Sequence, residues 1–206
     1  MGALLCFPPA ATMNPSALPP PAQDILQFWF GAPPLKAQQR WFAKDAAFDA
    51  QIRKRFGAYI EAALRGELDG WQSDAQAALA RLLLLDQFTR NVFRDTPRAF
   101  AGDALALAGA RALVDAGQDQ VLAPLQRVFV YLPFEHAEDL AAQAQGLRLF
   151  EALARCDTTA ADFEFWARKH HVIIERFGRF PHRNAVLGRE STVEEIEFLQ
   201  QPYSRF

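Results

Sequence analysis

Hydrophobic residues recur every four positions through much of the chain, and this spacing constrains the fold more than any other feature. The clearest run lies between Asp45 and Gly66, and its members are Phe48, Ile52, Phe56, Ile60 and Leu64. Such spacing places the side chains on one face of an α-helix, whereas no window alternates with the period of two that a half-buried strand requires. The sequence therefore predicts an all-α protein of eight to ten helices joined by short links.

Capping residues and helix breakers indicate where the helices begin and end. Asp45 is the expected N-cap of the run above, and Gly66 its stop. The remaining expected segments are a helix from Asp24, a Ser73/Gln76 capping box ahead of a helix to Phe88, Thr96–Gly117, a start at Leu122–Pro124 with a short segment up to Pro133, about Glu135 to Leu153, Phe163–Phe177 before Gly178, and a short helix after Ser191 or Thr192 that ends near Pro202.

Residues 1–22 differ from the rest of the chain because they hold six prolines and no charged residue. Proline lacks a backbone N–H and disrupts helix interiors and central strands. We expect this segment to be a disordered extension, within which Met13 is an alternative start to Met1. The expected organisation is this extension followed by one compact helical domain over residues 23–206.

Composition excludes several classes of protein. A net charge of −2 over 206 residues gives no reason to expect nucleic acid or an anionic membrane as a partner. Two cysteines, Cys6 and Cys156, make no disulfide framework, and no run of about 18 apolar residues predicts a membrane span. We therefore expect a cytoplasmic protein. Its cofactor and its oligomeric state stay open.

Four strings stand out, although none is a standard nucleotide, zinc-protease or serine-hydrolase motif. The first is LLLLDQFTRNVFR, residues 82–94, in which Asp86, Arg90 and Arg94 lie four apart on one helix face, with Asn91 beside them. One interpretation is a ladder of ion pairs along the helix. The other is a carboxylate that orients Arg90 towards an anion.

The second string is PFEHAED, residues 133–139, which crowds three carboxylates and a histidine into about one helical turn. Acidic residues in a first turn are favoured by the helix dipole alone. Alternatively, His136 and Asp139 present two ligands to a metal. A histidine at a helix N-terminus is expected to be neutral, as a ligand or a hydrogen-bond partner.

The third string, residues 168–189, holds six basic residues and three histidines against one acid, Glu175. Gly178 is expected to end a helix, so that the following RFPHRN forms a loop anchored by Phe180 and Pro181. The polar residues Arg179, His182, Arg183 and Asn184 then project from that loop. His171 and Glu175 are interpreted as a solvated salt bridge or, alternatively, as a ligand pair.

The fourth string is the aromatic group ILQFWFG, residues 25–31, with Trp41 and Phe42. Aromatic residues at this density predict a core or a groove wall rather than a cofactor site.

The chain resembles a bacterial family of proteins of unknown function, numbered 924. The matching segments span nearly everything from Asp24 to Phe206 and are ILQFWFG, WFAKDAAFDAQIRKRF, LLLLDQFTRNVFRDTPRAF, YLPFEHAEDLAAQ, ERFGRFPHRNAVLGRESTVEEIEFL and QPYSRF. The family usually has other residues at Thr89, Ala137 and Val193, but these departures remove no charged group. The resemblance implies an all-helical fold of the tetratricopeptide-like superfamily and brings no activity with it.

Three functions and a purely structural role follow from these observations. The favoured hypothesis is a pocket of arginine, histidine and carboxylate residues that binds a small anion, since arginine pairs in bidentate fashion with carboxylates and phosphates. Its candidate residues are Asp86, Arg90, Asn91, Glu135, His136, Asp139, His170, Arg179, His182, Arg183 and Asn184.

The alternatives use the same strings differently. A metal-dependent hydrolase would take His136, Asp139, His170 and His182 as ligands, with Glu135 or Glu138 as the base and Arg183 as the charge stabiliser. A peptide- or protein-interaction module follows only from analogy with the superfamily. In the structural role, buried salt bridges cross-link the helices.

Overall fold

The computed structural model describes residues 18–205, which contain nine α-helices and no β-strand, so the predicted all-α class and helix number are confirmed. The α-helices are α1 Pro20–Phe30, α2 Ala46–Leu64, α3 Ala75–Leu82, α4 Thr89–Val92, α5 Asp103–Asp115, α6 Pro124–Glu135, α7 Leu140–Cys156, α8 Ala161–Phe177 and α9 Val193–Phe198. Short segments join them: the π-helical η3 Leu83–Phe88 and the 3-10 helices η1 Gln39–Trp41, η2 Asp69–Ser73, η4 Pro97–Phe100, η5 Gln118–Val121, η6 Thr158–Ala160 and η7 Pro181–Arg183.

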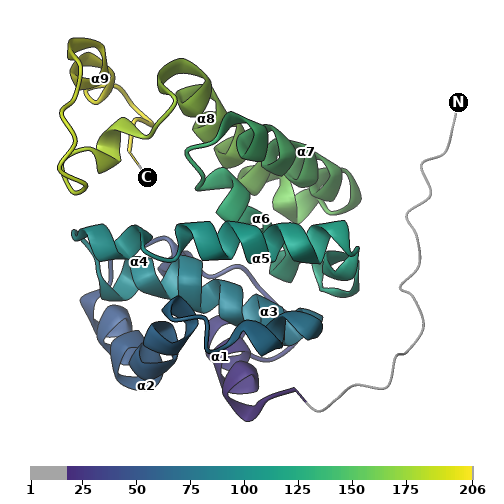
Figure 1. Ribbon diagram of the computed structural model, residues 1–206. Coiled ribbons are helices and arrows are strands. Elements are labelled where there is room, and N and C mark those ends of the chain that lie inside the picture. The colour runs from purple at the N-terminus through teal and green to yellow at the C-terminus, as the bar shows by residue number, and fades with distance from the viewer. Residues whose placement is uncertain (1–17, 206) are drawn as a thin grey trace, which may run out of the picture.

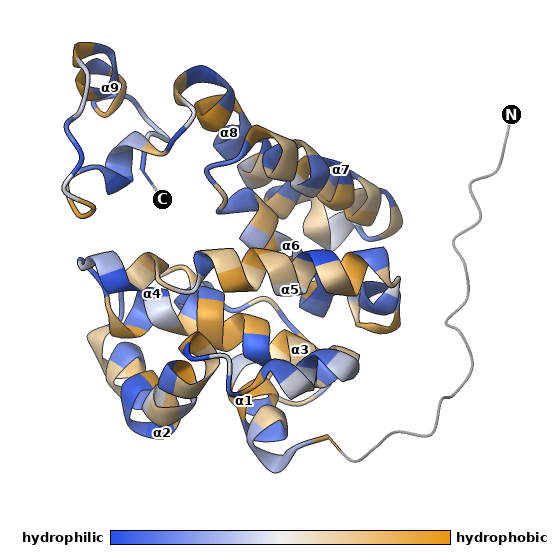
Figure 2. Cartoon of the chain, viewed as in Figure 1, coloured by the Kyte–Doolittle hydropathy of each residue, from blue (hydrophilic) through white to orange (hydrophobic). Residues whose placement is uncertain are grey.

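Helix α5 joins the two parts of the domain (Figure 1). It packs against α3, which belongs with α1, α2 and α4, and against α6, which belongs with α7 and α8. The C-terminal arm, residues 178–205, follows α8 and carries η7 and α9. In Figure 1 this arm lies above the end of the molecule where α4 lies. The segment between α8 and α9 is mostly hydrophilic in Figure 2, while the helices show both hydrophobic and hydrophilic residues.

The hydrophobic core is one large cluster, and aromatic residues of the fourth string lie in it. Trp29, Phe30 and Trp41 are buried, and the ring of Trp41 lies 4.9 Å from that of Phe129 on α6. The prediction of a core role is therefore confirmed for these three residues. Phe42 is 60% exposed and does not share it. A second, smaller hydrophobic cluster packs the C-terminal arm against α8, and it is formed by Ile173 and Ile174 of α8 with Phe180 of the arm.

The π-helical turn η3 joins α3 directly to α4, so residues 75–92 are helical throughout. A π turn leaves carbonyl groups without their usual helical partners and is frequent at functional sites. Here side chains supply partners: Thr89 donates to the carbonyl of Leu85 and Arg90 to that of Asp86. Gly102 approaches the same turn so closely that an added Cβ would lie 2.1 Å from the Leu85 oxygen.

Several predicted helix boundaries are confirmed. The Asp45 carboxylate caps α2 by accepting from the backbone N–H groups of Ala47 and Phe48. Thr192 and Glu195 form the capping box of α9, which decides between Ser191 and Thr192. Gly178 ends α8 in the left-handed conformation, with φ of 68°. In each case the local sequence supplies the hydrogen bonds or the backbone freedom that a helix end needs.

Other boundaries were predicted wrongly. Asp74 rather than Ser73 caps α3, because its carboxylate reaches the N–H of Ala77. The helix expected from Thr96 to Gly117 is divided into η4 and α5. Helix α6 continues through Pro133 to Glu135, and α7 begins only after Asp139.

Because of this last correction, the second string lies at the end of one helix and ahead of the next, not within the first turn of a helix. Glu135 and His136 lie at the C-terminal end of α6, not in the first turn of a helix. Asp139 is the N-cap of α7. The argument that a helix N-terminus keeps His136 neutral is therefore wrong.

The predicted extension also needs correction at its end. Helix α1 begins at Pro20, so residues 20–22 belong to the domain, and Ala22 is fully buried. Proline is compatible with the first turn of a helix, because the N–H groups there have no helical acceptor. The prediction for residues 1–17 lies outside the described residues. Within residues 18–205, no helix is both long and apolar enough to cross a membrane, and the tetratricopeptide-like relationship stays a prediction.

Candidate functional site

Asp86 is the centre of a buried polar cluster. Asp86 is 1% exposed and lies on the π-helical turn η3. Oδ1 lies 2.7 Å from Nδ1 of His136 and 3.0 Å from the guanidinium of Arg90, while Oδ2 accepts from the Gln87 amide. The carboxylate therefore joins the first predicted string to the second, 50 residues further along the chain.

Asp103 extends this cluster towards the C-terminal arm. It accepts two hydrogen bonds from Arg90, at 2.9 and 3.1 Å, in a bidentate arrangement. It also accepts from Nη1 of Arg183, at 3.3 Å. One carboxylate at the start of α5 is thus shared between two arginines, one from each side.

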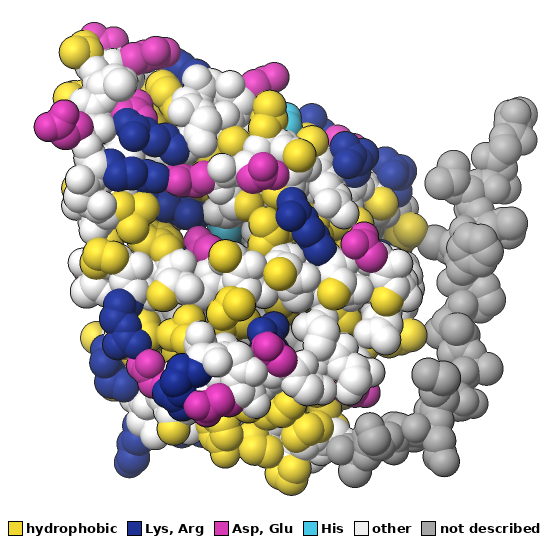
Figure 3. Space-filling view, viewed as in Figure 1, with side chains coloured by type: hydrophobic (Ala, Val, Ile, Leu, Met, Phe, Trp, Pro, Cys, Tyr) yellow, Lys and Arg dark blue, Asp and Glu magenta, His cyan; other side chains and the backbone are white. Residues whose placement is uncertain are grey.

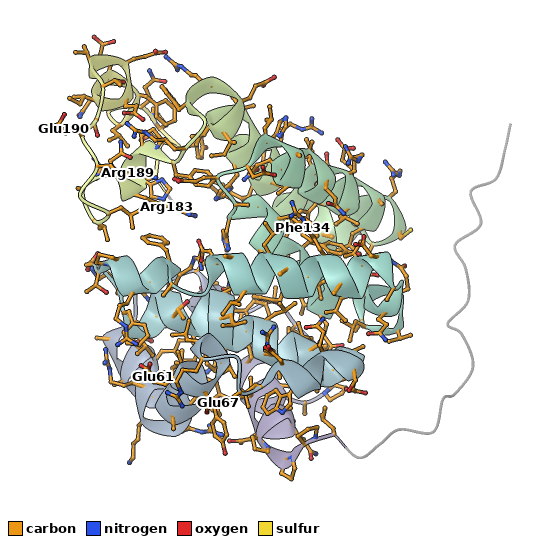
Figure 4. The ribbon with its side chains drawn as sticks, in the orientation of Figure 1. Glu61, Glu67, Phe134, Arg183, Arg189 and Glu190 are labelled. Carbon is orange, nitrogen blue, oxygen red and sulfur yellow. The ribbon has the colours of Figure 1, made fainter. Side chains whose placement is uncertain are left out.

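Arg183 is held between two aromatic rings. Its guanidinium carbon lies 4.7 Å from the centroid of Phe100 and 4.5 Å from that of Phe180, within the range of cation–π attraction. The residue is 6% exposed, and its Nε has no hydrogen-bond partner among residues 18–205. Figure 4 shows the side chain extending from the arm towards the helices below it.

A second carboxylate–histidine pair lies beside the first. Nδ1 of His170, on α8, lies 2.9 Å from Oε1 of Glu135 and 2.9 Å from the carbonyl oxygen of Trp166. The rings of His136 and His170 meet edge to face with centroids 6.2 Å apart. The other oxygen of Glu135, Oε2, is buried and has no hydrogen-bond partner in the described part of the chain.

These contacts define the polar cluster as Asp86, Arg90, Asp103, Glu135, His136, His170 and Arg183. Figure 3 shows histidine and acidic side chains below a group of basic ones, at the junction between the C-terminal arm and the helices under it. A surface cavity of about 900 Å³ lies elsewhere, between α1 and the start of α6, and its lining is mostly apolar. None of the cluster residues lines that cavity.

The charges in the cluster set the pKa of the Asp86–His136 pair. Burial alone would raise the pKa of Asp86, but Arg90 and His136 outweigh burial and hold that pKa well below its usual range. Burial is also the main influence on His136, and with the positive charge of Arg90 it lowers the pKa of the imidazole against the attraction of Asp86. Near neutral pH the pair is therefore an ionised carboxylate bonded to a neutral imidazole.

Burial also lowers the pKa of two groups in the RFPHRN string. The pKa of His182 falls to about 3, through burial and then the charge of Arg183. The pKa of Arg183 falls to about 10, through burial and then the neighbouring charge of Arg90. Its positive charge is therefore only partly offset by the surrounding carboxylates.

Several candidate residues lie in other networks. Asn91 donates to Asp49, which also accepts from Arg94. Asp139 caps α7 and lies 3.7 Å from Arg111. The carboxylate of Asp139 is 55% exposed. Neither Asn91 nor Asp139 contributes to the polar cluster.

Arg179 and Asn184 stabilise the C-terminal arm itself. Both donate to Glu195 of α9, and Arg179 does so with two hydrogen bonds of 2.7 and 2.9 Å. The pKa of Glu195 falls to about 2, chiefly through the hydrogen bond from Arg179. The prediction placed these side chains among ligand contacts, but here they cross-link the arm.

The same arm is tied to the rest of the domain by Arg189. This residue donates to both oxygens of Glu138 and to Asn184. Figure 4 labels Arg189 on the arm, beside Arg183. The backbone of Phe180 takes part in the same network: its N–H donates to Glu138, and its carbonyl accepts from Arg189.

The expected metal ligands do not converge. Among residues 18–205, no group of three or more His, Cys, Asp or Glu side chains is arranged to hold a metal ion. His136 directs Nδ1 to Asp86, while Asp139 caps a helix. The arrangement instead places two carboxylate-bound histidines next to a clamped arginine.

Asp103, Phe100 and Gly102 were missed by the sequence analysis, although Asp103 bonds both arginines of the cluster. An acid in the first turn of a helix is common and gives no functional signal. The neighbouring Gly102 was the only local sign, because a glycine there allows α5 to approach the backbone of Leu85.

Comparisons with other proteins agree with this architecture. A family model described as a bacterial protein of unknown function (DUF924) matches residues 25–203. The solved structure of a protein of unknown function from Agrobacterium tumefaciens, ATU0120, is 46% identical with a TM-score of 0.79, and the match covers 87% of this chain and 96% of that one. No protein with a curated description matches. The chain therefore belongs to the bacterial DUF924 family.

Proposed function

We propose that this protein binds a small anion, a carboxylate or a phosphate group, at Arg183. The observation that carries the proposal is the clamp formed by Phe100 and Phe180 around the guanidinium. Such a clamp fixes the plane of the guanidinium group, so less conformational entropy is lost when an anion accepts hydrogen bonds from it.

The two arginines of the cluster differ in how completely their charges are neutralised. Arg90 contacts both Asp86 and Asp103 and bonds Asp103 in bidentate fashion. Among residues 18–205, the one carboxylate that bonds to Arg183 is Asp103, at 3.3 Å, and Arg183 shares it with Arg90. A further anion is therefore expected at Arg183 rather than at Arg90.

Burial strengthens this preference. Arg183 is 6% exposed, and burial with the repulsion of Arg90 lowers its pKa to about 10. An anion that pairs with its donors offsets this repulsion in surroundings that screen charge poorly. The same features would penalise a neutral ligand, which leaves the buried charge uncompensated.

The test is the thermal stability of the protein with inorganic phosphate, acetate or citrate at constant ionic strength. A ligand that binds the native state raises the free energy of unfolding by about 2.7 kcal/mol at 100 times its Kd. We expect at least one of these anions to raise Tm. Arg183→Lys should reduce the response, because lysine keeps the charge but not the planar pair of donors.

Arg168→Lys is the matched control. Arg168 lies on α8, 54% of its side chain is exposed, and its partners Glu151 and Glu164 lie outside the cluster. This variant should respond to anions as the wild type does. The proposal is wrong if none of the three anions raises Tm more than sodium chloride does, or if Arg183→Lys responds as fully as the control.

A further inference from the structure

The imidazole of His136 forms a hydrogen bond to a buried carboxylate, which orients the ring. Nδ1 lies 2.7 Å from Oδ1 of Asp86, and Asp86 is itself fixed by Arg90 and Gln87. Because Asp86 stays ionised, it accepts the hydrogen bond and Nδ1 carries the proton. The lone pair of the neutral imidazole is therefore on Nε2, on the opposite side of the ring.

This arrangement is the one that enzymes use to prepare a histidine as a base. A carboxylate on Nδ1 fixes the tautomer and stabilises the positive charge that develops when Nε2 takes a proton. The side chain of His136 keeps 14% of its surface exposed, so the ring is held firmly but is not sealed off. A carboxylate, an arginine and an amide therefore converge beside a mostly buried ring.

The cluster contains the groups for activating water but not for a covalent intermediate on a hydroxyl or thiol. Its seven members are aspartate, glutamate, histidine and arginine residues, and none carries a hydroxyl or a thiol group. A base at this position would therefore act on water or on a hydroxyl of the ligand directly. The buried oxygen Oε2 of Glu135 is available to accept a hydrogen bond from the other proton of that water.

We infer that His136 is a general base that activates water for the hydrolysis of small anionic esters, positioned by Asp86. The location of the substrate rests on the proposed function, with the carboxylate of the ester held at Arg183. Asp86 is a positioning residue, since it acts on the substrate only through His136.

The reaction balances within the cluster. Nε2 of His136 accepts a proton from water as the water oxygen bonds to the ester carbonyl carbon, and the carbonyl electron pair moves to its oxygen. When the carbonyl re-forms, the bond from carbon to the alcohol oxygen breaks. The leaving oxygen takes the proton from His136, which restores the base and releases an acid and an alcohol.

Two matched esters separate this inference from the proposed function. The first is 4-acetoxybenzoate, which is an anion, and the second is its methyl ester, which is neutral. The measurement is the release of the phenol from each, as kcat/KM, for the wild type and for His136→Gln, Asp86→Asn and Arg183→Lys. His171→Gln is the control, because His171 lies on α8 outside the cluster.

We expect His136→Gln to lower kcat/KM for both esters by about 100-fold or more, the usual contribution of a general base. Asp86→Asn should lower both as well, mainly through kcat. Arg183→Lys should lower the rate with the anionic ester more than the rate with the neutral ester. The control should hydrolyse both esters at the wild-type rate.

The wild-type pH profile provides a readout that needs no variant. The charged and titratable groups around His136 are Asp86 on η3, Arg90 on α4, Glu135 on α6 and His170 on α8. Because burial and Arg90 prevail and lower the pKa of His136, the acid limb of kcat/KM should have its midpoint below 6.5.

The outcomes are distinct. Hydrolysis that survives His136→Gln, an absence of hydrolysis by the wild type, or an acid limb at or above pH 6.5 overturns the general-base inference. Equal rates with both esters and no effect of Arg183→Lys overturn the anion site but leave His136 as the base. Stabilisation by phosphate without hydrolysis of either ester supports the anion site and overturns the base.

Discussion

Asp103 lies 3.3 Å from Nη1 of Arg183, although the two residues are 80 positions apart in the chain. The contact joins the first turn of α5 to the C-terminal arm. Because Asp103 also binds Arg90, the loss of this one carboxylate affects both guanidinium groups at once. It therefore links the stability of the domain to the charge of the proposed anion site.

Asp103→Asn should destabilise the protein and strengthen the binding of phosphate. Removing one partner from a buried ion pair typically costs 3–5 kcal/mol, and the 21% exposure of Asp103 reduces this to about 1–3 kcal/mol. Arg183 then loses the carboxylate that bonds to it, so phosphate should recover part of the lost stability. Urea unfolding with and without phosphate measures both effects.

Asp24→Asn is the control for that prediction. Asp24 pairs with Arg55, and about half of each side chain is exposed, so the pair is worth about 0–1 kcal/mol. Phosphate should not act differently on this variant and on the wild type. If Asp103→Asn is as stable as the wild type and phosphate does not change its free energy of unfolding, the shared role of the carboxylate is contradicted.

Phe100→Ala should weaken phosphate binding without unfolding the protein. Phe100 is half-buried, and its ring forms one side of the clamp around Arg183. Loss of a partly desolvated cation–π contact of about 1–2 kcal/mol corresponds to a fall in affinity of about 5- to 30-fold. Isothermal titration with phosphate gives this value directly.

Phe93→Ala removes a similar contact elsewhere. The ring of Phe93 lies 3.9 Å from the guanidinium carbon of Arg98, whose side chain is 53% exposed. The affinity for phosphate should be unchanged in this variant. Equal losses in Phe100→Ala and Phe93→Ala would show that the clamp has no specific part in binding.

Local signals in the sequence predicted those features of the fold that depend on neighbouring residues. Asp45, Thr192 and Gly178 end or begin helices through contacts within a few positions, and all three were identified. Pro133 was misinterpreted as a stop because its effect depends on context. The helix continues through it, and the residue is buried within α6.

The cluster was only partly predictable for the same reason. Asp86, Arg90, Glu135, His136, His170 and Arg183 stood out as polar residues next to apolar ones, and the structure brings them together. Arg179 and Asn184 have the same appearance in the sequence but bind Glu195. Which partner a buried arginine takes is decided by tertiary packing, and a single sequence does not encode that choice in any local pattern.

Gly102→Ala should be the most damaging of the small substitutions. An added Cβ would lie 2.1 Å from the carbonyl oxygen of Leu85, a backbone atom that cannot move without distorting the π turn that holds Asp86. We expect a loss of roughly 3 kcal/mol or more, as in severe overpacking. Circular dichroism during thermal unfolding measures it.

Gly57→Ala is the matched substitution on α2. An added Cβ there would meet no atom within 4 Å beyond the neighbouring backbone of its own helix, and alanine is favoured over glycine in a helix by about 0.8–1.0 kcal/mol. This variant should be more stable than the wild type. A similar Tm for both glycine variants would contradict the close approach of α5 to η3.

His182 should make the protein less stable as the solution becomes acidic. Its pKa is about 3 in the folded protein, because of burial and then Arg183, against 6.5 for an ordinary histidine. Between these values the unfolded chain binds a proton that the folded protein does not bind. The free energy of unfolding should therefore fall by about 1.4 kcal/mol for each pH unit below 6.5 from this group alone.

His182→Gln should remove that part of the pH dependence, while His171→Gln should retain it. The measurement is the free energy of unfolding in urea at pH 7, 6, 5 and 4. His136 contributes a slope of the same sign, because its pKa is also lowered in the folded protein. The slope should therefore be reduced in His182→Gln but not abolished, and parallel curves for the wild type and His182→Gln would show that His182 gains its proton equally in both states.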